Sequence, residues 1–127
     1  MVEHPFALDP LAGFPYSNVV VSGDLVAVAS QVPFGEDGHL VGREFADQAH
    51  QVFANLRKCL QVAGCDLVNV IKVTGYLARP DLVDEYNEIY RQYFTPPYPA
   101  RTTVACGLVV PAMLVQVEAF ARIPVAE

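Results

Sequence analysis

The hydrophobic period of this sequence changes at Phe45, and this change limits the fold more than any other feature. From Phe45 to Ala63 the apolar side chains recur at steps of three and four residues, as on one face of an α-helix. These side chains are Phe45, Ala49, Val52, Leu56, Leu60 and Ala63. Gly64 follows at once, and glycine favours the end of a helix. The pattern therefore predicts a helix over residues 45–63 with one buried face.

Patterns typical of strands lie on both sides of this helix. Residues 19–31, VVVSGDLVAVASQ, contain two β-branched runs around a Ser-Gly-Asp turn, which predicts a hairpin. Residues 68–77 predict another strand. A second helix is expected with Asp81 as its N-cap, and its apolar face would consist of Leu82, Tyr86, Ile89, Tyr90 and Tyr93. After the TPPYP stretch, the remaining residues predict two strands joined around residues 109–112.

The resulting order is strand, strand, helix, strand, helix, strand, strand. Two long amphipathic helices and one largely antiparallel sheet predict an α+β sandwich, in which both helices pack on the sheet. The chain has 127 residues, which suits a single domain over residues 1–127. Its strands are apolar on both sides, so we expect a partner subunit to cover the face without helices.

Charge and cysteine content exclude several classes of protein. The net charge of -6 disfavours binding to a phosphate backbone, so no nucleic acid is expected as a partner. Three cysteines without a CxxC pair, and an N-terminus without a basic start or an apolar run, indicate a cytoplasmic protein. The uncharged stretch 102–117 is too short to span a membrane. The histidine spacing predicts no metal site.

One cation, Arg101, stands in the otherwise apolar stretch PARTTVACGLVVPAMLVQVEAFARI, which runs from residue 99 to residue 123. If the last two strands form a tight hairpin, Arg101 lies opposite Glu118 and Thr103 lies opposite Gln116, all on one face. One interpretation is an internal ion pair between Arg101 and Glu118, which adds little stability. The other is that the guanidinium lines a cleft and binds a substrate carboxylate through two hydrogen bonds.

Several short motifs carry a family resemblance. The run PAR followed by Thr102 and Thr103, and the later VQVEAFA, resemble the Pro-Ala-Arg and V-E-I-E-A motifs of the Rid family of reactive-intermediate deaminases, also called the YjgF family. FPYSN is similar to the family's N-terminal Pro-Tyr element, VASQVP to its Ser-Gly-Gln-Ile-Pro strand and YNEIYRQYF to its second helix. The resemblance covers nearly the whole chain, and its C-terminal motif is the most specific part.

This resemblance implies a chorismate-mutase-like sandwich (bacillus type) that assembles as a homotrimer with three clefts between subunits. It implies hydrolysis of 2-imino acids, or of enamine tautomers such as 2-aminoacrylate, to 2-keto acids and ammonia, without a cofactor or a metal. Arg101 would hold the substrate carboxylate, and the imino or keto acid would lie in the inter-subunit cleft. The other positions that match the family's site are Tyr16, Ala29, Ser30, Asn87, Thr103, Gln116 and Glu118.

Two of these positions depart from the family's pattern. Gln116 stands where the family has the glutamate thought to orient the attacking water, and Ala29 stands where it has a serine. An amide can orient water but cannot take its proton, so we expect a specialised or weakened hydrolysis unless Glu118 takes over. The alternative is a trimer that binds a small carboxylate, as a sensor or pathway partner, without chemistry. A third reading, a ribonuclease or translation inhibitor, is disfavoured by the net charge.

Overall fold

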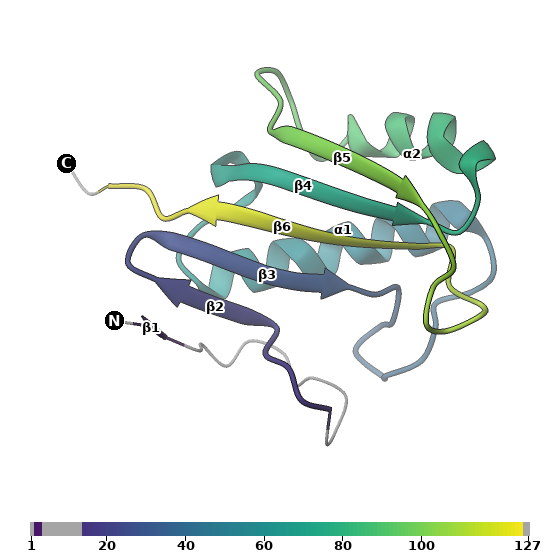
Figure 1. Cartoon of the computed structure of the whole chain (residues 1–127), viewed down its shortest axis with the longest axis horizontal. Helices are drawn as coiled ribbons and strands as arrows, with labels where there is room; N and C mark the ends of the chain where they lie inside the picture. The colour runs from purple at the N-terminus through teal and green to yellow at the C-terminus, as the bar shows by residue number, and fades with distance from the viewer. Residues whose placement is uncertain (1, 4–13, 126–127) are drawn as a thin grey trace.

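The computed structural model describes residues 2–3 and 14–125. These residues form one six-stranded sheet with the strand order β1-β2-β3-β6-β4-β5 (Figure 1). The elements are β1 (Val2–Glu3), β2 (Val19–Ser22), β3 (Leu25–Gln31), α1 (Phe45–Val62), the 3₁₀ helix η1 (Leu67–Asn69), β4 (Val70–Leu77), the 3₁₀ helix η2 (Pro80–Leu82), α2 (Val83–Tyr90), β5 (Ala100–Ala105) and β6 (Val115–Arg122).

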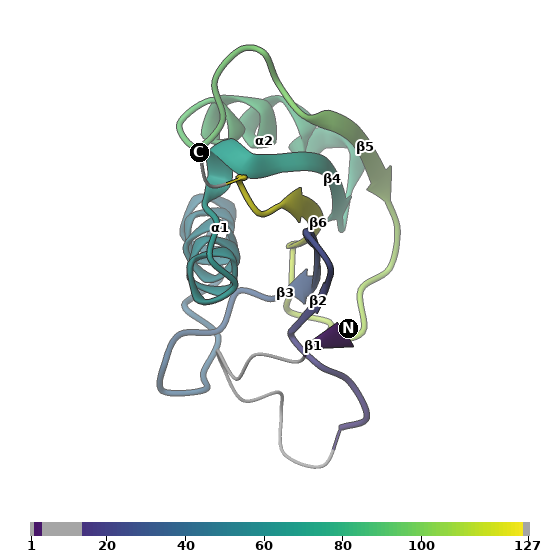
Figure 2. The same cartoon turned by 90° about the vertical axis from the view of Figure 1, so that its left-hand side faces the viewer.

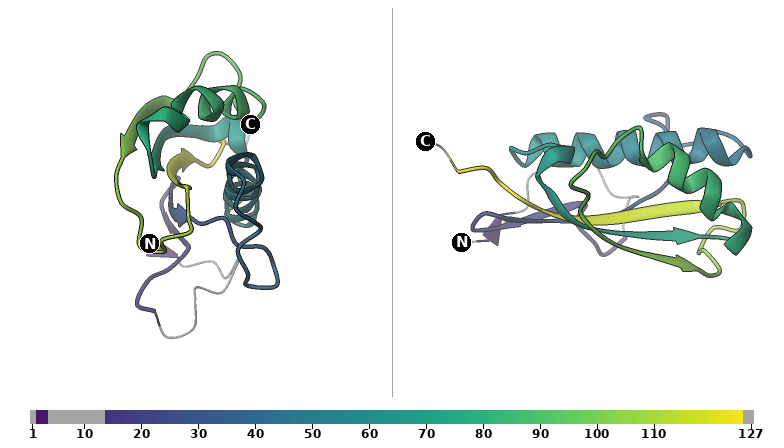
Figure 3. Two further views of the ribbon diagram at one scale, coloured as in Figure 1. Left: turned by 90° about the vertical axis from the view of Figure 1, so that its right-hand side faces the viewer. Right: turned by 90° about the horizontal axis from the view of Figure 1, so that it is seen from above.

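Both α-helices lie on the same face of the sheet, as Figure 2 and the right-hand view of Figure 3 show. The core lies between these layers. We call the helix-covered side the helix face and the other side the open face. The expected α+β sandwich of two helices on a mostly antiparallel sheet is confirmed. None of the helices within residues 2–3 and 14–125 combines the length and the hydrophobicity that a membrane-spanning helix needs.

Helix α1 ends within one residue of its expected boundary, and Gly64 follows with a φ of +90°, which glycine adopts readily. One buried polar side chain of α1, Gln48, joins the helix to two loops. The amide nitrogen donates to the carbonyls of Gly42 and Ala112, and the amide oxygen accepts from the backbone N–H of Leu114. These bonds satisfy a fully buried polar group and fix the loop that leads into β6.

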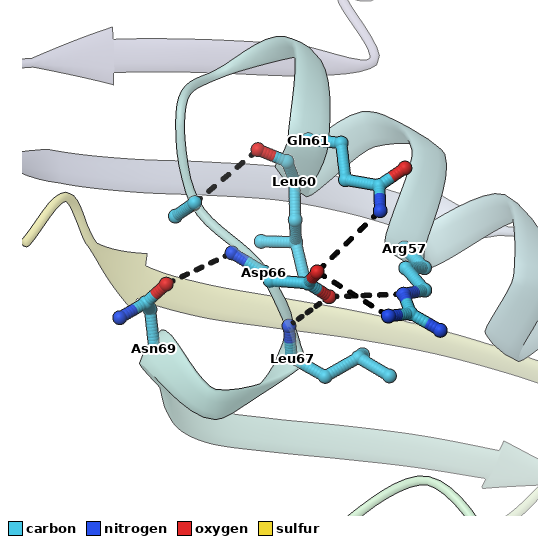
Figure 4. A network of polar contacts seen from close by, with 7 residues as sticks. Arg57, Leu60, Gln61, Asp66, Leu67 and Asn69 are labelled. Carbon is cyan, nitrogen blue, oxygen red and sulfur yellow. Dashed lines mark hydrogen bonds and ion pairs between the residues drawn. The ribbon is translucent and has the colours of Figure 1, made fainter.

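A polar network connects the end of α1 to the start of β4 (Figure 4). The Asp66 carboxylate accepts from the backbone N–H of Leu67 and from the Arg57 guanidinium, while the Asn69 side chain accepts from the Asp66 backbone N–H. This reciprocal cap orders η1 just before the chain enters the sheet. Partial burial alone would raise the pKa of Asp66, but these hydrogen bonds outweigh burial and lower it.

The expected hairpin of the last two strands is wrong. Strand β4 lies between β5 and β6, and pairs parallel with β5 and antiparallel with β6. The reason is topological: β4, α2 and β5 form a βαβ unit, in which the crossover helix makes the two strands parallel. Strand β6 then inserts between β3 and β4, instead of turning back on β5.

This topology places Arg101 and Glu118 on opposite faces of the sheet. Arg101 pairs with Val73, which pairs with Ala119, and both of these partners are buried on the helix face. Glu118 instead pairs with Thr74, one residue further along β4, and consecutive residues of a strand point to opposite faces. The same alternation places Thr103 on the helix face and Gln116 on the open face. Thr102 and Val104, the residues of β5 between and beyond these helix-face positions, are exposed.

The start and end of the second helix differ from expectation. Asp81 lies inside η2, and α2 is preceded by Leu82 without a side-chain cap, so the N-cap prediction is wrong. Pro80 favours this short 3₁₀ turn because its fixed φ suits the first position of a helix. Tyr93 follows the end of α2 and stacks on Phe53 of α1 at a centroid distance of 4.8 Å. The helix nevertheless buries Tyr86, Ile89 and Tyr90 against the sheet, as its period predicts.

Candidate active site

Arg101 extends from the beginning of the edge strand β5 toward α2. Its guanidinium carbon lies 5.4 Å from the ring centre of Tyr86 and 4.9 Å from that of Tyr90. Both distances are within the range of a cation–π contact. Tyr86 and Tyr90 are one helical turn apart, so the helix presents both rings to the same side chain. The guanidinium is thereby held in place while its hydrogen-bond donors stay accessible, because the residue is exposed.

A pocket of about 250 Å³ opens beside this arginine. Its lining residues come from one face of α2 and from the segment that leads into β5; they are Asn87, Tyr90, Arg91, Tyr98, Pro99 and Arg101. We call this space the arginine pocket. Asn87, Tyr90 and Arg91 are three and four residues apart and so share one face of the helix. One side of the pocket is therefore formed by a single turn of α2.

The charge of the arginine pocket is positive. None of its lining residues is acidic, although the chain has 14 Asp and Glu residues. Among the described residues Arg101 forms no ion pair, and the proposed pair with Glu118 is wrong because the sheet separates the two side chains. A guanidinium without a protein counter-ion, beside two aromatic rings, is suited to bind a carboxylate.

Four buried side-chain atoms at or beside this pocket have no hydrogen-bond partner among the described residues: Tyr86 Oη, Asn87 Oδ1, Tyr90 Oη and Thr103 Oγ1. Burial raises the pKa of Tyr86 well above its usual value and that of Tyr90 to about 12, although Arg101 opposes both shifts. Both phenols are therefore neutral near pH 7. They present hydroxyl groups, which can donate or accept, beside a carboxylate-binding cation.

The open face holds a different set of polar groups. Glu118 accepts a hydrogen bond from the Tyr76 hydroxyl, and this bond is the main reason that the pKa of Tyr76 is raised. Tyr76 pairs with Gln116 across the β4–β6 ladder, so the three side chains lie together on half-buried positions. Glu118 is therefore engaged with a phenol rather than with Arg101.

The remaining expected site residues lie toward the other side of the molecule. Ala29 and Ser30 lie opposite Glu118, where β3 has an irregularity between its pairs with residues 119 and 117. Tyr16 lines a separate pocket of about 300 Å³, together with Gln31, the loop that follows β3 and two side chains of α1, Asn55 and Lys58. One chain therefore brings Arg101, Asn87 and Thr103 together, and it groups Ala29, Ser30, Gln116 and Glu118 on another part of the sheet.

Two residues of this region are not among the expected site residues. The signal for Arg91 is its spacing of four residues from Asn87, which places both on one helical face. The contact between Tyr76 and Glu118 depends on the pairing of β4 with β6, which the expected hairpin of the last two strands excludes. In the described part of the chain no group of three or more His, Cys, Asp or Glu side chains is arranged to hold a metal ion.

Comparisons with known proteins agree with this architecture. The family model described as Endoribonuclease L-PSP matches residues 7–123. A RutC family protein of Pyrococcus horikoshii is 35% identical over 108 residues, which are 84% of this chain and 86% of that protein. The human protein named 2-iminobutanoate/2-iminopropanoate deaminase is 33% identical over 108 residues, 84% of this chain and 79% of its own length.

Solved structures of similar proteins have the same fold. The structure of RidA from an Antarctic Psychrobacter has a TM-score of 0.83 at 30% identity and covers 90% of this chain and 93% of its own. The structure of yeast Mmf1 has a TM-score of 0.88 at 27% identity and covers 96% and 98% of the two chains. The likeness therefore extends over nearly the full length of each chain.

Proposed function

Because the chain belongs to the endoribonuclease L-PSP family, which includes proteins called Rid and YjgF, we propose that it hydrolyses 2-imino acids and their enamine tautomers to 2-keto acids and ammonia. The observation that carries this proposal is Arg101, whose guanidinium has no ion pair among the described residues and lies over two tyrosines in a pocket without acidic groups. The name of the human relative supports the same class of reaction.

The reaction requires binding and one molecule of water. Water adds through its oxygen to the imine carbon, the C=N electrons move to nitrogen, and nitrogen takes a proton. The resulting carbinolamine re-forms a C=O bond, and the C–N bond breaks to release ammonia. Arg101 binds the adjacent carboxylate through its two-pronged fork and so holds the imine carbon at one place. Proximity alone accelerates this step, because imines already react readily with water.

The groups that handle water come, in this proposal, from a second copy of the chain. The open face exposes Ile71, Val104 and Phe120, whose exposed fractions are 45%, 36% and 41%, which supports a subunit contact there. We place the arginine pocket of one subunit against the Gln116–Glu118 segment of its neighbour, in a homotrimer with three shared clefts. This arrangement brings together residues that one chain holds on opposite faces of its sheet.

Mixing two inactive variants tests the shared site. Arg101→Ala and Glu118→Ala chains, unfolded together and refolded at equal amounts, are expected to recover about a quarter of the wild-type activity. With random assembly, about a quarter of the clefts receive an intact Arg101 from one chain and an intact Glu118 from the other. Each variant refolded alone is the control. If the mixture stays as inactive as its components while native mass spectrometry detects mixed trimers, the site is not shared between subunits.

Gln116 limits the rate in this proposal, because its amide orients the water without accepting a proton. Glu118 cannot fully replace a general base, since the Tyr76 hydroxyl occupies it. We expect Gln116→Glu to raise kcat for imine hydrolysis about tenfold, which is below the full effect of a general base. Gln116→Leu, which neither orients water nor takes a proton, is the matched control. A Gln116→Glu variant that is slower than wild type would show that the amide itself is needed.

A second candidate function is binding without chemistry, in which the cleft captures a small keto acid. Two observations favour it: Gln116 in place of a carboxylate, and Glu118 engaged with Tyr76. The deciding assay uses an amino-acid oxidase to generate imino acids and semicarbazide to trap them. A working deaminase lowers semicarbazone formation, whereas a binding protein leaves it unchanged and still gives a heat of binding with the keto acid.

A further inference from the structure

A second guanidinium lines the arginine pocket. Arg91 directly follows the last residue of α2 and stands on the same helical face as Asn87 and Tyr90. The pocket therefore has one cation from the end of a helix and one, Arg101, from the edge strand β5. Both reach it from elements whose positions are fixed by the buried rings of Tyr86 and Tyr90.

Neither cation of the pocket has a protein counter-ion in the described part of the chain. The four ion pairs found there use Arg57, Lys58, Arg79 and Arg122, each with a nearby Asp or Glu. Two positive charges that line one small pocket repel each other, and the repulsion is relieved when negative charge enters between them. A ligand with one carboxylate can neutralise only one of the two.

We propose that the arginine pocket binds substrates with two carboxylates, namely 2-imino acids whose side chain ends in a second acidic group. This inference rests on the proposed function and names the substrate class for that site. Arg101 takes the carboxylate beside the reacting carbon, where two tyrosines hold its guanidinium. Arg91 takes the distal carboxylate. The reaction is unchanged: water replaces the imine nitrogen, ammonia leaves, and the product is a dicarboxylic 2-keto acid.

The competing explanation is that Arg91 serves only the helix. A cation at the C-terminus of a helix interacts favourably with the helix dipole, whatever the ligand. This explanation predicts a loss of stability in Arg91 variants and no change in ligand preference. The two explanations therefore differ in a ratio of affinities, which a purely structural role does not change.

Calorimetry with two stable keto acids tests the proposal. The probes are 2-oxoglutarate, which has two carboxylates, and 2-oxobutanoate, which has one. We expect wild type to bind 2-oxoglutarate about tenfold more tightly, as one additional charge-assisted contact implies. Arg91→Gln should reduce the ratio of the two affinities by the same factor, and Arg91→Lys should retain part of it. Arg79→Gln removes the same charge outside this pocket and should keep the full ratio.

The outcomes separate the subsite from the reaction. If wild type shows no preference for 2-oxoglutarate, or if Arg91→Gln weakens both keto acids equally, the second-carboxylate subsite is overturned even when imines are hydrolysed. If the preference depends on Arg91 but no imino acid is hydrolysed, the subsite stands and the proposed function fails. Thermal unfolding of each variant shows whether the protein remains folded in the binding experiment.

Discussion

Replacing Arg101 with alanine is expected to lower kcat/KM for imine hydrolysis about 100-fold, which is toward the upper end of what a charge-assisted contact contributes. The loss is large because Arg101 is the only cation over Tyr86 and Tyr90 among the residues that the structure describes. Arg101→Lys should recover only part of the activity, since an ammonium keeps the charge but lacks the planar fork that binds both carboxylate oxygens. Steady-state kinetics with oxidase-generated imino acids measures both effects.

The matched control for this experiment is Arg79→Ala, which removes an exposed arginine that does not line the pocket. Its kcat/KM should stay within about twofold of wild type, because an exposed surface charge contributes little. Thermal stability of Arg101→Ala should change little as well, since an exposed cation–π contact contributes about 0.5–1 kcal/mol. Full activity of Arg101→Ala would mean that the substrate carboxylate binds elsewhere.

Local patterns predicted the local structure of this chain well. The helix over residues 45–63 and the hairpin over residues 19–31 agree with α1, β2 and β3, because apolar period and turn chemistry act over neighbouring residues. Strand pairing beyond such a hairpin depends on crossovers, which no local pattern records. The last two strands looked like neighbours for that reason, although β4 lies between them.

That single pairing error determined which site predictions were wrong. Once Arg101 was paired with Glu118, an ion pair on one face followed, whereas alternation along β4 places the two on opposite faces. The grouping of Arg101 with Asn87 needed the packing of α2 on the sheet, and only the family resemblance suggested it. The spacing of Arg91 from Asn87 places both on one helical face, but an arginine near a helix end is ordinarily solvated, so the spacing alone does not mark Arg91 as a site residue.

The packing beneath Arg101 depends on a glycine in the middle of the sheet. Gly75 of β4 faces the fully buried ring of Tyr86, and a Cβ at this position would lie 2.9 Å from the ring's Cζ and closer still to its hydroxyl. Tyr86 cannot easily move away, because Phe53 stacks with it at 6.0 Å and Tyr90 lies 5.8 Å away. A glycine is therefore required here because the Tyr86 ring lies where a Cβ would be, and not because of the backbone dihedral angles of Gly75.

Gly75→Ala is accordingly expected to lower the free energy of unfolding by about 3 kcal/mol, at the upper end of the usual cost of overpacking a core. For a domain of this size the melting temperature should fall by about 10 °C, measured by circular dichroism at one fixed protein concentration because subunit association affects it. Gly107→Ala is the control, since a Cβ at Gly107 would meet nothing within 4 Å, and its melting temperature should stay near that of wild type.

A second substitution tests whether the clash with the Tyr86 ring is the cause. The Tyr86 hydroxyl has no hydrogen-bond partner among the described residues, so Tyr86→Phe alone should cost little stability. In the Gly75→Ala background, Tyr86→Phe should restore about 1 kcal/mol, because it removes the atom nearest to the new methyl group while Cζ remains close. The same double variant should regain part of the affinity for a keto acid, since the Tyr86 ring supports the Arg101 guanidinium. If the two substitutions prove additive, the Tyr86 ring does not transmit the clash, and Gly75 affects stability through the β-sheet backbone instead.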